Sequence, residues 1–229
     1  MSRGVLVTGA SRGIGHAIAL AFEGHGDRVF AHSTRQGDLR DPAAAEATVS
    51  AAIAALGAID VLVNNAAVSV KQPLPTTSYA DWQRAWQETF AVNVFGAANV
   101  TYWVARHMID RGIAGRIINV GSRGAYRGEP DNPAYGASKA ALHSMGQSLA
   151  VSLAPHGIGV ASVAPGYVAT ERQTRALTGE RGEHIRSQSP FGRVATPDEV
   201  AAAVIYLASP PAGWASGAVL DLNGASYLH

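Results

Sequence analysis

The sequence predicts an α/β fold in which helices cover both faces of a doubly wound, mostly parallel β-sheet. Short apolar runs alternate with longer segments whose apolar residues recur every three or four positions, from one end of the chain to the other. A helix between two strands carries the chain back across the sheet, which makes the strands parallel. No linker or internal repeat interrupts the pattern, so residues 1–229 are expected to form a single domain.

Six apolar runs are the expected strands. They cover residues 5–7, 29–31, 59–63, 116–120, 158–163 and 218–222. Helix starts are marked by Asp41-Pro42 and by residues 196–199, where Thr196 is the cap and Glu199 closes a capping box. A long helix rich in small residues is expected from Tyr135 to about Ala154.

Composition restricts the classes of function. Apolar residues make up 47% of the chain and charged residues 15%, which is typical of a globular protein. A formal net charge of +1 gives no field that attracts nucleic acid or an anionic membrane. The absence of cysteine excludes thiolate metal sites, and the eight histidines lack zinc-type spacing, so no metal is expected. No leader-like start and no apolar run of roughly 18 residues occur, which predicts a cytoplasmic enzyme or binding protein.

A glycine-rich segment follows the first strand and opens the first helix. Residues 8–15 read Thr-Gly-Ala-Ser-Arg-Gly-Ile-Gly. Glycines let such a turn approach a pyrophosphate, and the free N–H groups of the helix N-terminus attract the anion. Glycine turns also occur for structural reasons alone, but the strand–turn–helix context favours a dinucleotide site. The domain is therefore expected to be a dinucleotide-binding domain of the Rossmann type.

The end of the second strand bears on the choice of dinucleotide. An acidic residue there would bind the adenine ribose 2′-hydroxyl and select NAD, but residues 30–35, Phe-Ala-His-Ser-Thr-Arg, contain none. Arg12 and Arg35 are placed where a 2′-phosphate would lie, and guanidinium groups suit phosphate. The alternative is that both arginines are solvated surface residues. The sequence favours NADP(H), with NAD(H) as the alternative.

Tyr135 and Lys139 stand four residues apart in the long helix and therefore share a face. The unperturbed pKa of a phenol is about 10, and a neighbouring ammonium favours the phenolate, which suits proton transfer near neutrality. Lys71 and Lys139 are the only lysines, whereas all other cationic residues are arginines or histidines. The use of lysine at position 139 therefore indicates that a compact ammonium is required there. The alternative is an incidental surface pair; the sequence favours an acid–base centre.

Together these residues resemble the short-chain dehydrogenase/reductase family. The resemblance rests on the glycine segment, Asn64-Asn65-Ala66, Ser122, the Tyr135–Lys139 pair and residues 165–170, in the family's order and over nearly the whole chain. The glycine segment is most similar to that of NADPH-dependent 3-oxoacyl reductases. The resemblance implies a catalytic domain that transfers hydride between NADP(H) and a ketone or secondary alcohol, a 3-oxoacyl thioester being the first candidate.

The resemblance also implies roles for individual residues. Tyr135 would be the general acid in reduction and the general base in oxidation, while Lys139 would hold the nicotinamide ribose and lower the pKa of Tyr135. Ser122 would donate a hydrogen bond to the substrate oxygen, and Asn93 would hold a water that links Lys139 to solvent. The expected cofactor contacts are Gly9, Ser11, Arg12, Gly13, Ile14, Gly15, Thr34, Arg35, Asp38, Leu39, Asn65, Ala66, Tyr135, Lys139, Val168 and Thr170.

Two features depart from the family pattern. Ala67 stands where the family has glycine, and tolerance is expected there. Between the second strand and Asp38 only residues 33–37 remain, where the family has a helix and a third strand. A parallel crossover needs a dozen or more residues. The third strand and the helix before it are therefore expected to be absent or vestigial, which leaves the second strand near a sheet edge and the adenine pocket more open.

The arginine-rich segment from about residue 166 to 194 has little strand character and is expected to form a substrate lid. A solvated surface helix is the alternative. Tyr126, Arg127 and Tyr167 are expected to border the substrate pocket. The expected partner is a small carbonyl or alcohol substrate.

Other functions and assemblies remain to be separated. A catalytically silent NAD(P)-binding regulator has no need for all four catalytic residues, and an epimerase or dehydratase on this fold would usually be longer. An NAD-dependent alcohol dehydrogenase of the same family stays open. A homodimer or homotetramer is expected, because the two long helices carry many small residues and homologues of this kind are usually symmetric.

Overall fold

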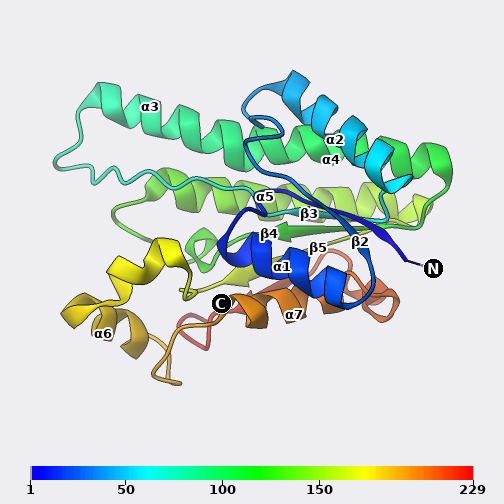
Figure 1. The fold of residues 1–229 in the computed structure, drawn as a ribbon. Coiled ribbons are helices and arrows are strands. Elements are labelled where there is room, and N and C mark those ends of the chain that lie inside the picture. The colour runs from blue at the N-terminus through cyan, green and yellow to red at the C-terminus, as the bar shows by residue number, and fades with distance from the viewer. Residues whose placement is uncertain (1, 229) are drawn as a thin grey trace.

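The computed structural model describes residues 2–228, in which six strands form one parallel sheet (Figure 1). The side chains of Arg172, Arg175 and Ala176 lie outside the description. The order across the sheet is β2-β1-β3-β4-β5-β6. The strands are β1 (Gly4–Val7), β2 (Arg28–Ala31), β3 (Val61–Asn64), β4 (Arg116–Val120), β5 (Gly159–Pro165) and β6 (Val219–Leu222). The α/β fold predicted from the sequence is confirmed, with each strand within two residues of its expected bounds.

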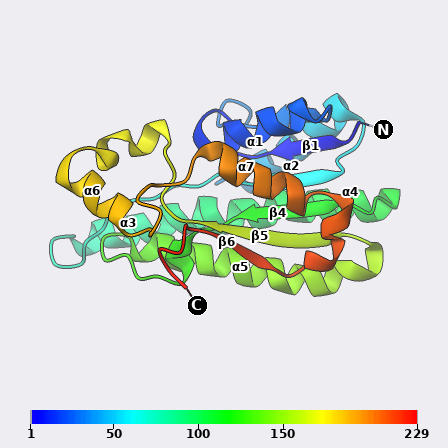
Figure 2. The same cartoon turned by 90° about the horizontal axis from the view of Figure 1, so that it is seen from below.

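Helices cover both faces of the sheet (Figures 1 and 2). One face carries α1 (Gly13–Gly24) and α7 (Pro197–Leu207), and the other carries α2 (Pro42–Leu56), α4 (Ala97–Arg111) and α5 (Pro133–Leu153). The remaining elements are the helices α3 (Tyr79–Phe90) and α6 (Gly179–Ser187), the π-helix η1 (Ala91–Gly96) and the short 3₁₀ helices η2 (Arg123–Ala125), η3 (Ala154–His156), η4 (Glu171–Leu177) and η5 (Pro210–Ala215). None of the described helices is long and apolar enough to span a membrane.

Alternation along the strands divides the interior into two cores. In β1, Val5 and Val7 pack with α1 and α7, whereas Leu6 between them packs with α2 and α4 on the other face. Phe22 of α1 is fully buried in the first core. The two cores hold the strands in register, so that their carboxyl ends meet along one edge.

The second strand lies at the edge of the sheet. Arg28 and Ala31 of β2 are exposed, and within residues 2–228 no strand pairs with its outer side. The chain instead turns after β2, where Ser33 donates from its N–H and its hydroxyl to Gln36 Oε1 (2.9 and 2.7 Å). It then reaches the α2 cap Asp41. The predicted loss of the third strand and its helix is confirmed for the described chain.

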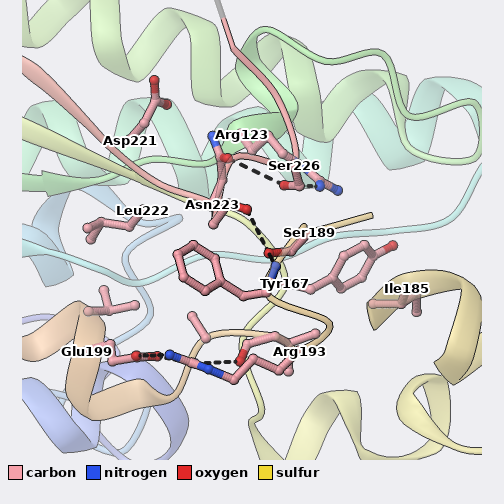
Figure 3. A pocket seen from close by; sticks show the side chains of 15 residues that line it. Arg123, Tyr167, Ile185, Ser189, Arg193, Glu199, Asp221, Leu222, Asn223 and Ser226 are labelled. Carbon is pink, nitrogen blue, oxygen red and sulfur yellow. Dashed lines mark hydrogen bonds and ion pairs between the residues drawn. The ribbon is translucent and has the colours of Figure 1, made fainter. Parts of the chain in front are cut away.

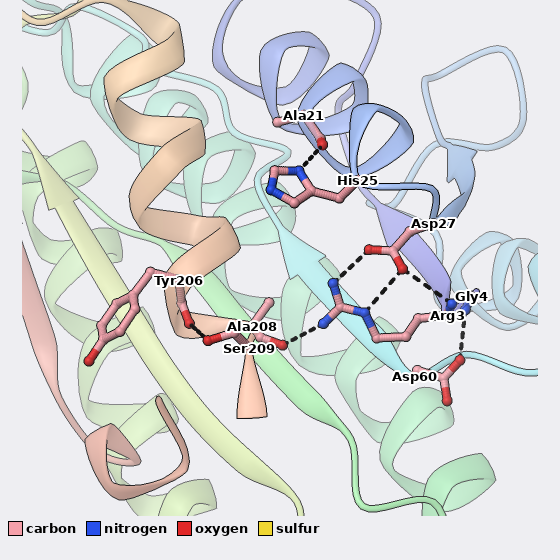
Figure 4. Close-up of polar contacts among 9 residues, drawn as sticks. All are labelled: Arg3, Gly4, Ala21, His25, Asp27, Asp60, Tyr206, Ala208 and Ser209. Carbon is pink, nitrogen blue, oxygen red and sulfur yellow. Dashed lines mark hydrogen bonds and ion pairs between the residues drawn. The ribbon is translucent and has the colours of Figure 1, made fainter. Parts of the chain in front are cut away.

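Charged groups fasten the amino end of β1 (Figure 4). Arg3 donates to both carboxylate oxygens of Asp27, at 3.1 Å (Nε) and 2.6 Å (Nη2), and to the carbonyl of Ala208 at 2.7 Å. Gly4 N–H donates to Asp60 Oδ2 at 2.7 Å. These bonds tie β1 to the turn before β2, to the end of α7 and to the residue before β3.

The helix starts follow the sequence signals. Asp41 accepts from Ala43 N–H at the start of α2, and the capping box of Thr196 and Glu199 is formed at the start of α7. The long helix α5 begins at Pro133, two residues before Tyr135, and ends at Leu153. The segment 166–194 contains η4 and α6 and no named strand, and its role as a lid stays a prediction.

Candidate active site

A cleft of about 470 Å³ opens where the carboxyl ends of β1, β3, β4 and β5 meet. Its lining includes every predicted cofactor contact except Arg35 and Val168. This is the side of a doubly wound sheet where ligands bind, because the strand order reverses there. The fold therefore brings together side chains that stand far apart in the sequence.

The glycine turn is built for close approach. Gly9 has φ +65°, and a Cβ there would lie 2.7 Å from Ala66 Cα. A Cβ on Gly15 would lie 2.4 Å from the carbonyl oxygen of Gly9. Arg12, the residue before α1, makes no side-chain hydrogen bond to the start of the helix. The first N–H groups of α1 therefore lack an acceptor from the capping residue. Such a bare turn fits a pyrophosphate.

Thr8 and Asn65 hold this turn against β3. Asn65 Nδ2 donates to the carbonyls of Thr8 (2.9 Å) and Gly9 (3.0 Å). The Thr8 hydroxyl accepts from the N–H groups of Asn65 (3.0 Å) and Ala66 (3.1 Å). The Asn65 side chain, predicted as a cofactor contact, thus also positions the turn that would hold the phosphates.

At the adenine end of the cleft, one predicted arginine is missing from the lining and another arginine, not predicted, is present. Arg12, Thr34, Asp38 and Leu39 line the cleft as expected, whereas Arg35 does not. Arg40, which was not among the predicted contacts, lines the cleft and binds Asp38 through Nε at 3.0 and 2.9 Å. Hydrogen bonds from Arg40 hold the pKa of Asp38 below its ordinary value. No local pattern indicates Arg40, because its position depends on the path of the shortened loop.

Lys139 is the most unusual ionisable group in the cleft. It is 2% exposed, and burial lowers its pKa to about 8. Its Nζ donates to the carbonyl oxygen of Val120 at 2.7 Å and lies 5.7 Å from the centre of the Tyr135 ring. An ammonium has three donors, so two remain for a bound ligand. Tyr135 and Ser122 line the same cleft.

Asn93 lies in the π-helix η1 and is buried beside this group. Its Oδ1 accepts from Val68 N–H (2.8 Å), and its Nδ2 donates to Val68 O (2.9 Å) and to Ser138 Oγ (2.9 Å). Ser138 Oγ in turn donates to the carbonyl of Tyr135 at 2.7 Å. The side chain thus fixes the loop after β3 to α5, and both Nδ2 hydrogens are used. Any water that Asn93 holds would be bound at another of its atoms.

A second cavity of about 440 Å³ adjoins the cleft. Ser122 and Tyr135 line both spaces, and Val168 lines the second one only. The second cavity also carries Tyr167, Arg123, Arg181 and Lys71. Tyr126 and Arg127, which were expected to border the substrate pocket, do not line it. Ser122 and Tyr135 therefore stand where a cofactor and a small substrate would meet.

Comparison with known proteins agrees with this arrangement. A family model described as Enoyl-(Acyl carrier protein) reductase matches residues 9–224. The chain belongs to the short-chain dehydrogenase/reductase family. It is an oxidoreductase of the class that interconverts CH–OH and C=O groups.

Relatives are similar over almost their full length. The chain is 33% identical over 249 residues to an L-rhamnose 1-dehydrogenase (NAD(P)(+)) of Sphingomonas sp. (strain SKA58), with 98% of this chain and 96% of the relative covered. It is 34% identical over 245 residues to an acetoacetyl-CoA reductase of Shinella zoogloeoides, with 100% of each covered. Among solved structures, ElxO with NADP bound superposes with a TM-score of 0.87 at 26% identity, covering 99% of both chains.

Proposed function

We propose that this protein is an NADPH-linked reductase of a small ketone. The observation that carries the proposal is the placement of Ser122 and Tyr135 in the lining of both the cofactor cleft and the adjoining cavity. A carbonyl group at that junction can meet a hydroxyl donor and a phenol together. No other group of residues in the described chain combines such a junction with a buried ammonium.

The chain's own residues account for the proton. Ser122 and Tyr135 would hydrogen-bond the carbonyl oxygen, and the Tyr135 hydroxyl would give its proton to that oxygen as negative charge develops there. The buried Lys139 ammonium, 5.7 Å from the Tyr135 ring centre, favours the phenolate that remains. Asn93, through Val68 and Ser138, would keep the loop after β3 and helix α5 in place. A bound NADPH would supply the hydride.

The cofactor preference follows from the end of β2. The position directly after β2, where an acid would bind a ribose 2′-hydroxyl, holds His32, which is buried and whose Nε2 lies 3.1 Å from the Gly37 carbonyl oxygen. Arg12 and Arg40 line this end of the cleft and can face a 2′-phosphate. ElxO, one of the solved structures similar to this chain, has NADP bound. We therefore propose NADP(H) as the preferred cofactor and NAD(H) as the weaker one.

Affinities for the two cofactors test this preference. We expect NADPH to bind at least tenfold more tightly than NADH, and Arg12→Gln to weaken NADPH while leaving NADH within about threefold. Arg35→Gln is a matched control, because Arg35 does not line the cleft. A tenfold preference for NADH in the wild-type protein would overturn the proposal.

For the substrate we propose a 3-oxoacyl compound. The acetoacetyl-CoA reductase from Shinella zoogloeoides supports this class, since it matches over its full length. A second candidate is the oxidation of a sugar or polyol, which the match to an L-rhamnose 1-dehydrogenase favours. A screen that follows NADPH formation or consumption with 3-oxoacyl thioesters, simple ketones and polyols, beside Tyr135→Phe, separates the candidates. Turnover of no compound above the Tyr135→Phe level would instead favour a catalytically silent regulator.

Assembly into a homodimer or homotetramer belongs to the same proposal. The exposed large apolar side chains include two sets on packed secondary structure: Phe95, Tyr102, Trp103 and Val151 on η1, α4 and α5, and Tyr206, Trp214 and Leu220 on α7, η5 and β6. β6 is also an edge strand with an unpaired side in the described chain. Two such surfaces fit a tetramer with two kinds of contact. A monomer in light scattering at micromolar concentration would contradict this.

A cytoplasmic location, expected from the sequence, is proposed as well. It is tested by fractionating cells and following the protein with an antibody. Recovery with the membrane or extracellular fraction would contradict it.

A further inference from the structure

Two cavities meet at one buried arginine. The second cavity of the active site, of about 440 Å³, is called the catalytic cavity below because Ser122 and Tyr135 line it. It shares Arg123 and Tyr167 with a neighbouring cavity of about 320 Å³. Figure 3 shows the neighbouring cavity, with Arg123 and Ser226 on one side and the Arg193–Glu199 pair on the other. Arg123 directly follows Ser122 in the chain, and both residues line the cavity of about 440 Å³. A cation therefore lies in the wall of the cavity that holds the carbonyl position of the proposed function.

The guanidinium of Arg123 is buried and incompletely satisfied. The residue is 3% exposed. Its Nη1 donates to Ser226 Oγ at 2.6 Å, and its Nη2 lies 3.7 Å from Glu129 Oε1, beyond hydrogen-bond distance. Its Nε has no hydrogen-bond partner among the described residues. The ring of Tyr167 lies 5.4 Å from the guanidinium carbon and shields it from water.

A charge in this position needs a counter-charge. Burial lowers the pKa of Arg123, and Arg127 nearby adds to the effect, but a guanidinium still carries its charge at neutral pH. Burying a charge is unfavourable unless it is paired and hydrogen-bonded. Glu129 forms an ion pair with Arg123 at 3.7 Å, but it is partly exposed and beyond hydrogen-bond distance, and the pKa of Arg123 stays lowered, so the compensation is incomplete.

The other charged side chains that line the catalytic cavity are mostly positive as well. Arg181 and Lys71 also line it, and Glu129 is the only acidic residue in its lining among the described residues. Lys71 Nζ forms an ion pair with Asp131 Oδ2 at 3.7 Å, and both side chains are exposed. An anion in the cavity would thus meet an excess of positive charge.

We propose that Arg123 binds a carboxylate of the substrate, and that the 3-oxoacyl substrate is therefore taken as a compact free oxo acid. This inference rests on the proposed function and specifies its substrate. The parallel N–H donors of a guanidinium match the two oxygens of a carboxylate. Because Arg123, Ser122 and Tyr135 line one cavity, a single small molecule can present its carboxylate to Arg123 and its carbonyl group to Ser122 and Tyr135. The cavity of about 440 Å³ has room for such a molecule.

Two substrates, one a carboxylate and the other its methyl ester, test the proposal. Acetoacetate and methyl acetoacetate present the same 3-oxo group, and only the first carries a carboxylate. We expect Arg123→Met to lower kcat/KM for acetoacetate by about 30-fold or more, which is the lower range for removing one partner of a buried charge pair. The same variant should change kcat/KM for the methyl ester by less than about threefold, and Arg123→Lys should restore part of the loss for the acid.

Two control variants separate recognition from structure. Ser226→Ala removes the 2.6 Å hydrogen bond of Arg123 but keeps its charge, so it should affect acid and ester equally and slightly. Arg193→Met removes an arginine that lines the neighbouring cavity only and is paired with Glu199, so the acid-to-ester ratio should stay at the wild-type value. Circular dichroism and thermal unfolding establish that each variant is folded.

The outcomes distinguish this proposal from the proposed function. Equal losses for acid and ester in Arg123→Met, or a wild-type preference for the ester, would overturn the role of Arg123 while leaving reductase activity intact. If the wild-type protein reduces neither compound, calorimetric titration with acetoacetate in the presence of NADP⁺ decides. Binding that weakens at least 30-fold in Arg123→Met then supports the carboxylate site although reduction has failed, and unchanged binding overturns it.

Discussion

Replacing Gly15 by alanine tests whether the glycine turn is shaped for a ligand. Gly15 is the third residue of α1, and its missing Cβ leaves room for the Gly9 carbonyl and the Asn65 amide. An added Cβ would lie 2.4 Å from Gly9 O and 2.3 Å from Asn65 Nδ2. Real Cβ atoms essentially never come closer than 3.0 Å to such neighbours, so the turn must shift. The shift displaces the same backbone that would approach the pyrophosphate.

The cost follows from the size of this clash. Overpacking by one methyl group at a rigid site costs about 1–3 kcal/mol. If the turn moves aside in the free protein, the cost appears as weaker cofactor binding, by about 5- to 150-fold. If the turn is held in place, the cost appears as a lower free energy of unfolding.

Gly24→Ala is the matched control. Gly24 is the last residue of the same helix, and a Cβ there would meet nothing within 4 Å. Alanine restricts the unfolded chain more than glycine does, so this variant should keep its cofactor affinity and gain about 0.5–1 kcal/mol of stability.

Fluorescence titration with NADPH and urea denaturation measure the two quantities. We expect the combined loss for Gly15→Ala to reach at least about 1 kcal/mol. A Gly15→Ala protein that matches wild type in both NADPH affinity and unfolding free energy would refute the reasoning about the turn.

Three further predictions concern stability. Thr196→Ala removes the cap of α7 and should lower the free energy of unfolding by about 1 kcal/mol, or Tm by roughly 2–4 °C, in a thermal scan; an unchanged Tm would contradict the capping role. Burial lowers the pKa of Lys139 from 10.5 to about 8, so the folded protein loses this proton at a lower pH than the unfolded chain does. As pH rises from 8 to 10.5, the cofactor-free wild-type protein should therefore gain up to about 3 kcal/mol of unfolding free energy relative to Lys139→Met. A difference in unfolding free energy that does not change with pH in urea denaturation would contradict this. Burial alone would raise the pKa of Asp27, but the bonds from Arg3 lower it below 3.8. The stability that the Asp27 carboxylate contributes is therefore complete above pH 3.8 and is lost as pH falls through the pKa of the folded state. The difference in unfolding free energy between wild type and Asp27→Asn should narrow in acid, and a difference that widens there would contradict this.

The strands and the outline of the site could be predicted because they depend on local sequence. An apolar run such as Val61 to Val63 is buried on both faces of a parallel sheet, and this requirement is visible in the residues themselves. The missing third strand could also be predicted, since five residues cannot complete a crossover. Lys139 stood out because the chain uses arginine elsewhere.

What the sequence did not reveal depends on how distant segments meet. Arg40 rather than Arg35 lines the cleft, because the turn closed by Ser33 and Gln36 carries Arg35 away from it. Asn93 binds the loop at Val68, a contact across 25 residues that no local pattern indicates. Arg123 shows its burial and its unsatisfied Nε only once η2 packs against the chain's last residues.

The transfer of a proton from Tyr135 is the central claim, and one measurement tests it most directly. Protein saturated with NADPH is mixed rapidly with the best ketone from the screen, and the loss of NADPH absorbance is followed in a single turnover. We predict that Tyr135→Phe slows this step at least 100-fold, in the range expected for general acid catalysis, while the Kd for NADPH stays within about threefold. Equal single-turnover rates for wild type and Tyr135→Phe would contradict the account.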